Sequence, residues 1–407
     1  MVSSPTDSSS DAVAPEPRAR AAVRVQPAAR LALVLVALCL LVPLVGILAQ
    51  SESALEDFHT RRLHAWPQPT AFRQDPVQYL REVRDWLADR AFPIMASSRL
   101  SKRAAYFLLH DAPSPRITLG KEGHVFINGS DDQKIHWFFE AACLNAHLPP
   151  QVHRLERNLK EWARLARRRQ LRVDVVVIPT SASIYADKLP VSVPAQYREA
   201  CGRRTSGESP LLDVRGVGAV SFLYPLREML AARGDPAFFP RGNWHPTGLS
   251  LQVVRNTYLA RLGLPGPSEE TLELGWAPAE ALASYGIDQA EPTYFLHDPH
   301  VRADPAGAAE LRRRIEDEFV GPVFVLHVFD NDRPPTTESV LMLSDSFGDL
   351  AAEAFAGGFR RLIQIDTNQL RPGYGQELVD RLQQFEPIQR IILLVREGGA
   401  RRLAVLA

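Results

Sequence analysis

The chain has 407 residues, 45% of them hydrophobic, which is enough to build one large domain or two ordinary ones around a proper core. Its 47 basic residues balance its 47 acidic residues. Neither this balance nor any cluster of basic and aromatic residues suggests nucleic-acid binding, which depends on a strongly basic surface.

An uncharged apolar segment lies near the N-terminus, over residues 31–49. Its 19 residues are close to the roughly 20 that a helix needs to cross a bilayer. Arginines precede it, which directs the N-terminus to the cytoplasm. A cleaved signal peptide is the alternative, but its apolar core is usually about 7–15 residues long. We therefore predict a disordered cytoplasmic tail over 1–30, a transmembrane signal anchor over 31–49, a linker over 50–74 and an extracytoplasmic domain over 75–407.

Two of the three cysteines lie beyond this segment. Cys39 belongs to the apolar run, whereas Cys143 and Cys201 follow it. An oxidising compartment would allow the second pair to form a disulfide. The sequence leaves the pairing open because it does not give the distance between their Cα atoms.

Segments with helical and strand periodicity alternate along the remaining chain. The β-branched run 172–178 is typical of a buried parallel strand. This alternation predicts an α/β fold, with a mainly parallel sheet flanked by helices. Helices are predicted over 79–88, 155–170, 214–233, 247–262, 349–356 and 376–384. Strands are predicted over 172–178, 322–329, 339–343, 361–366 and 389–396, and residues 120–127 are predicted to form a turn that leads into a short strand. Residues 263–320, rich in Pro, Gly and Glu, are predicted to form a less regular insertion.

A serine follows the apolar run 340–343, at a polar turn that leads into a helix. At the carboxyl end of a parallel strand, the hydroxyl of Ser346 would lie where α/β sheets bind ligands. The first amides of the next helix could stabilise an oxyanion there. Serine needs a base to become a nucleophile, and His245 is the candidate. The alternatives are a serine that only caps a helix and a surface histidine before Pro246.

Two neighbouring features favour the catalytic interpretation. Asn243 stands two residues before His245, close enough to orient the imidazole. Residues 178–185 end another predicted strand with small hydroxyl side chains, which could line the same crevice. A simple helix-capping turn at Thr180 or Ser181 is the alternative for this segment.

Several short blocks occur in an order that resembles a known family. They are Trp-Leu-Ala-Asp-Arg-Ala-Phe-Pro at 86–93, Gly-Lys-Glu-Gly-His-Val-Phe at 120–126, the strand-Pro-Thr-Ser block at 175–190, Leu-Leu-Asp-Val at 211–214, Arg-Gly-Asn-Trp-His at 241–245 and Ser-Asp-Ser-Phe at 344–347. Together they resemble the SGNH-hydrolase-like alginate O-acetyltransferase family (AlgJ/AlgX type), which acetylates polysaccharides outside the cytoplasm. The resemblance covers about residues 75–396.

The resemblance implies roles for particular residues. Ser346 would be the nucleophile that carries the acetyl group, and His245 its general base and acid. Asn243 takes the place of the family's aspartate, although a carboxylate stabilises an imidazolium better than an amide does. Asp235 or another acid could replace that aspartate. Substrate-binding positions are expected at Arg241, Trp244, Tyr185 and Ser344, the last in place of a glycine.

The resemblance also implies a membrane-anchored periplasmic enzyme that O-acetylates a polysaccharide. A membrane-bound O-acyltransferase partner in the inner membrane would supply the acetyl group. Two alternatives share these residues: a catalytically weak carbohydrate-binding scaffold of a polysaccharide-secretion complex, and a carbohydrate acetylesterase. No cofactor or metal is expected, because the histidines lack zinc-type spacing, His297-Asp-Pro-His300 being the nearest approach.

Overall fold

The computed structural model describes residues 63–90, 92–129, 135–283, 285–318, 326–368, 374–399 and 403. The predicted tail and anchor, 1–30 and 31–49, lie outside these residues, as does the first part of the predicted linker. Within the described part of the chain, no helix is both long enough and apolar enough to cross a bilayer. The chain divides into two compact units, residues 1–97 and 98–407.

The described part of the first unit is helical. Helix α3 spans Ala71–Gln74 and α4 spans Pro76–Arg90, so the helix predicted over 79–88 lies within α4. The rings of Trp66 and Trp86 meet edge to face, with centroids 4.8 Å apart. Helix α5, Phe92–Leu109, runs across the division between the units.

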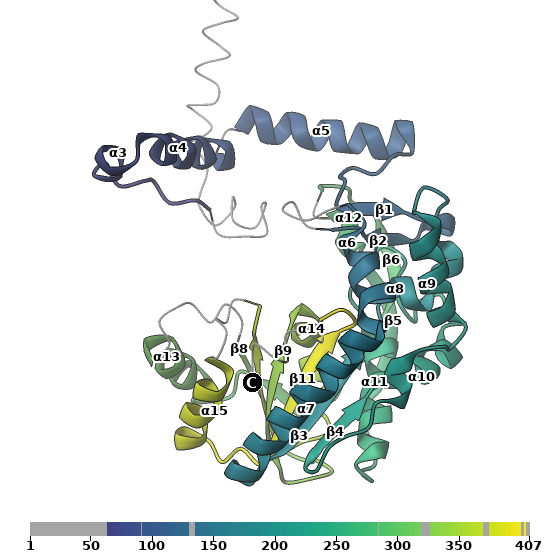
Figure 1. Cartoon of the computed structure of the whole chain (residues 1–407), viewed down its shortest axis with the longest axis vertical. Coiled ribbons are helices and arrows are strands. Elements are labelled where there is room, and N and C mark those ends of the chain that lie inside the picture. Colours follow the sequence, from purple (N-terminus) through teal and green to yellow (C-terminus); the bar gives the residue numbers. More distant parts are fainter. Residues whose placement is uncertain are drawn as a thin grey trace, which may run out of the picture. The chain divides into compact units, whose positions relative to one another are not determined.

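The second unit contains a seven-stranded sheet with the order β4-β3-β11-β9-β10-β8-β7 (Figure 1). Its first five strands are parallel, whereas β8 pairs antiparallel with both β10 and β7. The predicted mainly parallel sheet is therefore confirmed. The strands are β3 Arg172–Ile178, β4 Val220–Leu223, β7 Val301–Ala303, β8 Leu326–Asn331, β9 Ser339–Ser344, β10 Arg361–Asp366 and β11 Arg390–Arg396.

Helices cover the sheet. Helix α7 packs against β3 and β4, and α14 packs against the strands from β8 to β11 and against α11. The helices of this unit beyond α5 are α6 Trp137–Phe139, α7 Pro149–Arg169, α8 Ser181–Ile184, α9 Ala195–Thr205, α10 Leu226–Ala232, α11 Gly248–Arg261, α12 Glu280–Ala283, α13 Ala308–Glu318, α14 Ser346–Ala356 and α15 Tyr374–Phe385. Short helical turns are η1 Lys121–Gly123, η2 Glu140–Leu144, η3 Asn145–His147, η4 Ala186–Lys188 and η5 Pro210–Asp213.

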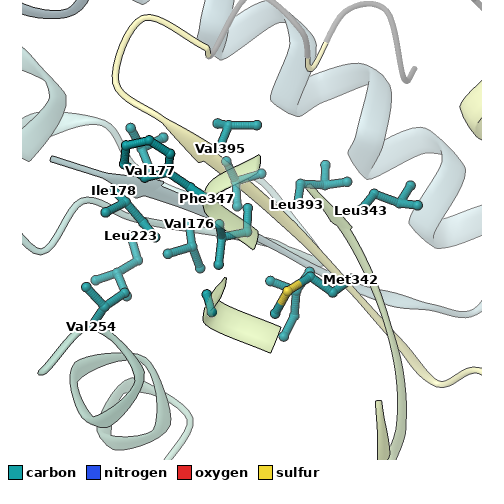
Figure 2. Packing of buried hydrophobic residues seen from close by; sticks show 14 of the residues in the cluster. Val176, Val177, Ile178, Leu223, Val254, Met342, Leu343, Phe347, Leu393 and Val395 are labelled. Atoms are coloured by element: carbon teal, nitrogen blue, oxygen red, sulfur yellow. The ribbon is translucent and has the colours of Figure 1, made fainter. Parts of the chain in front are cut away.

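The central strands are apolar on both faces, as expected for a covered parallel sheet. Leu343, Leu393 and Val395 lie on one side of the sheet in Figure 2, and Met342 lies on the other with Val254 of α11. All of these side chains are buried. A rigid, dry sheet thus supports the turns at its carboxyl edge.

The helix predicted over 214–233 is wrong in its first half. Val220–Leu223 is instead the edge strand β4, paired in parallel with β3, and α10 begins only at Leu226. Gly216 is needed in the preceding turn, since a Cβ there would lie 2.3 Å from the backbone oxygen of Val220. Pro225, which lacks an amide hydrogen, separates the strand from α10.

The segment 263–320 is more regular than the predicted insertion. Strands β5, Thr271–Pro278, and β6, Ala290–His297, form an antiparallel pair. Helix α12 lies in the connection between them, and β7 and α13 follow. A second pair of short strands, β1 Ile117–Leu119 and β2 Val125–Ile127, completes the fold. Strands β1 and β2 and the connection between β5 and β6 share one small apolar cluster.

The two cysteines that follow the apolar segment are joined. The Sγ atoms of Cys143, in η2, and Cys201, in α9, are 2.11 Å apart and form a disulfide. Both residues are fully buried. The bond fixes two segments that are 58 residues apart in the chain.

Candidate active site

The turn after β9 presents Ser346 at the carboxyl edge of the sheet. Ser346 is the first residue of α14, and its side chain is partly exposed. Asp345 caps the helix by accepting a hydrogen bond from the amide of Phe347 (3.1 Å), and its other oxygen accepts one from the amide of Arg396 (3.2 Å). As the first helical residue, Ser346 has an amide hydrogen with no acceptor within the helix.

A close contact between β9 and α14 fixes the direction of this turn. A Cβ atom on Gly348 would lie 2.0 Å from the side chain of Ser344, so only glycine fits there. Ser344 itself is completely buried, and its hydroxyl accepts a hydrogen bond from Gln364 (3.1 Å). The prediction that Ser344 binds substrate is therefore wrong, because α14 lies directly over it.

His245 lies beside the serine, although 101 residues separate them in the chain. The distance from His245 Nε2 to Ser346 Oγ is 3.0 Å. His245 sits three residues before α11, where Thr247 and Ser250 form a reciprocal capping box. Phe347 supports the imidazole edge to face, with ring centroids 5.1 Å apart. The expected proximity of the serine and the histidine is thus present.

The imidazole is oriented by Glu280, at the start of α12. Its Oε1 atom lies 2.6 Å from His245 Nδ1 and also accepts a hydrogen bond from the indole nitrogen of Trp244 (2.8 Å). The prediction that Asn243 orients the imidazole is wrong. The Asn243 side chain is turned toward α12, where its oxygen accepts a hydrogen bond from the amide of Glu280 (2.7 Å).

A small second core holds Glu280 in place. The residues on both sides of it, Ala279 and Ala281, are buried with Leu282 against β1 and β2. The carbonyl of Gly242 accepts a hydrogen bond from the amide of Ala281 (2.9 Å). The loop that carries His245 is therefore bonded directly to the short helix that carries Glu280. This arrangement lets a four-residue helix position a carboxylate accurately.

These contacts define the proton positions that catalysis would need. With Glu280 accepting at Nδ1, the neutral imidazole carries its proton on Nδ1, and Nε2 is free to accept. Nε2 is then placed to accept the hydroxyl proton of Ser346. The carboxylate also stabilises the imidazolium that forms when the proton moves.

A second acid lies one helical turn beyond the serine. Burial raises the pKa of Asp349 to about 7, and the negative charges of Asp366 and Asp345 act in the same direction. A hydrogen bond from Gln364 (2.6 Å) and the nearby His245 partly oppose this shift. Asp349 thus changes its charge near neutral pH beside the imidazole.

The hydrogen bonds described for the remaining predicted binding residues go to groups other than Ser346. Arg241 is exposed, and its guanidinium donates to the carbonyl of Glu122 (3.1 Å). Trp244 is half-buried against the second core and uses its indole nitrogen on Glu280. Tyr185 is buried and its ring packs against the ring of His124. Its hydroxyl lies 3.4 Å from the carbonyl oxygen of Arg233. Burial raises the pKa of Tyr185 to about 12, which keeps the phenol protonated.

The other acid considered for the histidine has a different task. Asp235 caps a turn at Ala237 and accepts a hydrogen bond from the hydroxyl of Tyr294 (2.9 Å). Glu280 lies in the segment predicted to be irregular, which explains why it was missed. One signal was present: an acid directly after Pro278-Ala279 and before an apolar stretch is typical of a helix start.

Within the described residues, no group of three His, Cys, Asp or Glu side chains is arranged to hold a metal ion. The segment after β3 serves a separate purpose. Thr180 precedes α8 and donates its amide to the buried carboxylate of Glu397 (2.9 Å). No hydrogen bond within the described residues joins this segment to Ser346, so the crevice-lining role predicted for it stays a prediction.

No protein-family model matches the chain, and no curated protein matches its sequence. Among solved structures, PatB1 of Bacillus cereus has a TM-score of 0.42 and 10% identity, over 70% of this chain and 96% of that one. The O-acetyltransferase domain of Pseudomonas putida AlgJ has a TM-score of 0.39 and 13% identity, over 70% and 91%. Pseudomonas aeruginosa AlgX has a TM-score of 0.40 and 11% identity, over 72% and 67%. The chain paths of these proteins agree with this one only loosely.

Proposed function

We propose that this chain is an O-acyltransferase that moves an acetyl group onto a sugar hydroxyl of a polysaccharide through an acetyl-serine intermediate. One observation carries the proposal: the continuous hydrogen-bonded chain from Ser346 through His245 to Glu280, with distances of 3.0 and 2.6 Å. The sequence blocks around Ser346 and His245 support the choice of reaction, since they resemble those of polysaccharide O-acetyltransferases.

The first half of the reaction loads the serine. The Ser346 hydroxyl attacks the carbonyl carbon of an acetyl donor while its proton passes to Nε2 of His245. The amide of Ser346, at the start of α14, is suited to hold the negative oxygen that develops. The leaving group takes the proton back from the imidazolium, and the acetyl group remains on the serine.

The second half of the reaction runs the same steps in reverse, with a sugar hydroxyl as the alcohol that accepts the acetyl group. A sugar hydroxyl gives its proton to His245 Nε2 and attacks the acetyl-serine, which restores the free hydroxyl. Glu280 keeps the imidazole in the required tautomer during both halves. Water in place of the sugar would give an esterase, so the acceptor decides between transfer and hydrolysis.

We also propose a periplasmic setting, with residues 31–49 anchoring the chain in the inner membrane. The arginines before this segment favour that orientation. A buried disulfide between Cys143 and Cys201 suits an oxidising compartment. A membrane-bound O-acyltransferase partner would then deliver the acetyl group from the cytoplasmic side.

The test uses the full-length protein and p-nitrophenyl acetate as the donor. We expect release of nitrophenol, an acetyl adduct on the peptide that contains Ser346 by mass spectrometry, and acetylated sugar when an oligosaccharide is added. Release of acetate alone, unchanged by any acceptor, would identify an esterase. Absence of both nitrophenol release and the adduct would overturn the proposal.

A further inference from the structure

The hairpin that carries Glu280 also presents an exposed aromatic and apolar face. Cross-strand partners in β5 and β6 share a face of the hairpin, which places Trp276 beside Pro292 and Leu274 beside Tyr294. Trp276 is 72% exposed and Leu274 58% exposed. We call these four residues the hairpin platform. A contiguous exposed apolar surface is a candidate binding site.

A polar cavity adjoins one end of this platform. It has a volume of about 280 Å³, and Pro292 belongs to both its wall and the platform. Arg241 and Glu122 bring charged groups to the wall, and Glu291 brings a carboxyl that is only 6% exposed. One oxygen of Glu291 accepts the amide hydrogen of Gly242 (2.7 Å), but the other, Oε1, has no hydrogen-bond partner.

The state of Glu291 suits a polar ligand. Burial raises its pKa, although the hydrogen bond from the amide of Gly242 opposes the shift. Its unpartnered oxygen is costly to bury unless some group satisfies it. A hydroxyl-rich molecule that entered the cavity would supply such a group.

We propose that the hairpin platform and the adjoining cavity bind the acceptor glycan, a chain of pyranose sugars. The choice of occupant rests on the proposed function. It is also supported by the chemistry of the surface, because a pyranose has an apolar face that can lie on an indole and hydroxyls that need polar partners at its edge. The two kinds of surface meet at Pro292, which belongs to the platform and lines the cavity, while Glu291 reaches the cavity from the other face of the hairpin.

The location of the platform fits this use. Trp276 and Glu280 are four residues apart in the chain, so their Cα atoms are separated by at most about 14 Å. Glu280 contacts His245, which contacts Ser346. A glycan on the platform would therefore be held by the strand that leads directly into α12, the helix whose Glu280 orients the imidazole. The opposite face of the hairpin is anchored to the loop of His245, because Thr293 of β6 binds Thr247 (2.9 Å).

The experiment measures glycan binding and ester hydrolysis separately. Binding of a mannuronate octamer and of cellohexaose is measured by calorimetry on full-length S346A protein, which lacks the proposed nucleophile and so should not acetylate or deacetylate the ligand. In this background Trp276→Ala should weaken the binding of at least one oligosaccharide by about 10-fold, while Trp276→Tyr keeps most of the affinity. With Ser346 intact, Trp276→Ala should hydrolyse p-nitrophenyl acetate within about twofold of the parent protein.

Phe295 provides a matched control, since it lies on the same hairpin, is 49% exposed and occupies the opposite face. Phe295→Ala should leave oligosaccharide affinity unchanged. Arg241→Ala should weaken binding of the anionic mannuronate octamer more than binding of neutral cellohexaose, because it removes a cation from the cavity wall, and equal affinities before and after the change would contradict a role for the cavity.

Three outcomes would overturn the inference: no binding of either oligosaccharide to S346A, unchanged affinity in Trp276→Ala, or loss of self-association in Trp276→Ala with glycan affinity unchanged. The last would assign the platform to a protein contact. A failure of the proposed function would show itself differently, as absent ester chemistry in the parent protein, with glycan binding still measurable.

Discussion

The described part of the molecule contains two hydrogen-bonded Ser-His-Glu chains, of which one is accessible and the other is buried. In the first, His245 bridges Ser346 and Glu280. In the second, His147 lies 2.9 Å from Ser209 Oγ and 3.2 Å from Glu397 Oε1. Both acids lie near the carboxyl ends of strands or just after them. Residue types alone would not distinguish the two groups.

Burial and additional partners separate them. All three members of the second chain are buried, and Glu397 is completely so. Glu397 also accepts hydrogen bonds from the amide of Thr180 and the hydroxyl of Tyr224. Although burial alone would raise the pKa of Glu397, its donors, His147 first, hold that pKa below its ordinary value.

The serine differs as well. Ser209 Oγ accepts the amide hydrogen of Leu211 and caps η5, so it is occupied in local structure. The hydroxyl of Ser346 does not cap a helix, because Asp345 caps α14. The comparison teaches that a catalytic serine needs a free hydroxyl and access, while the same residue types in a closed interior only join segments together.

The largest expected effect separates the two serines. Ser346→Ala should reduce the turnover of p-nitrophenyl acetate by about 10³-fold or more, because it removes the proposed nucleophile. Ser209→Ala is the matched control and should leave turnover within a few-fold. Initial rates on full-length protein, corrected for folded fraction by circular dichroism, decide the result. Equal losses in both variants would refute the distinction between the two chains.

The second effect separates the two acids. Glu280→Gln should lower kcat by about 10²- to 10⁴-fold with little change in Tm, because the amide no longer fixes the Nδ1 proton and the site is partly exposed. Glu397→Gln should instead lower Tm and leave kcat nearly unchanged. Its new amide hydrogens would face the donors of Thr180 and Tyr224, at a cost of about 3 kcal/mol in the free energy of unfolding.

Steady-state kinetics and thermal unfolding of both variants complete this test. A Glu397→Gln protein with normal Tm and strongly reduced kcat would assign chemistry to the buried chain. Asn243→Ala is a useful addition. It should raise KM or lower kcat only modestly, because Asn243 acts through the backbone of Glu280.

The smallest effect concerns Asp349. A folded-state pKa of about 7, against an ordinary value of 3.8, means that the folded protein holds this proton while the unfolded chain releases it. Stability therefore falls as pH rises between these two values. Asp349→Asn removes the cost of ionisation, so it should raise Tm by roughly 2–4 °C at pH 8 and by less at pH 5. An equal change in Tm at both pH values would contradict the assignment.

Much of the fold can be predicted from the sequence where burial is continuous. The strands β9 and β10 match their predicted ranges to within one residue, because apolar runs covered on both faces leave little choice of structure. The serine and histidine were also identifiable, since each sits at a sharp change from an apolar or glycine-containing segment to a helix start.

The features that could not be predicted from the sequence depend on pairing between distant segments. Val220–Leu223 is a strand only because β3 offers it an edge, and its local pattern resembles a helix. Glu280 reaches His245 only because β5 pairs with β6 and the second core buries its neighbours. Neither pairing leaves a mark in the local sequence. The wrong role given to Asn243 has the same origin, as proximity in the chain was taken for orientation in space.

The contact between Ser344 and Gly348 has a consequence for natural variation. The two positions share a space that admits one small side chain, and here the strand residue fills it. Chains with glycine at the position of Ser344 could therefore place alanine at the position of Gly348, whereas a pair of larger residues would push the helix away from the strand and move the nucleophile. The two positions should covary among homologues, and their combined volume should stay nearly constant.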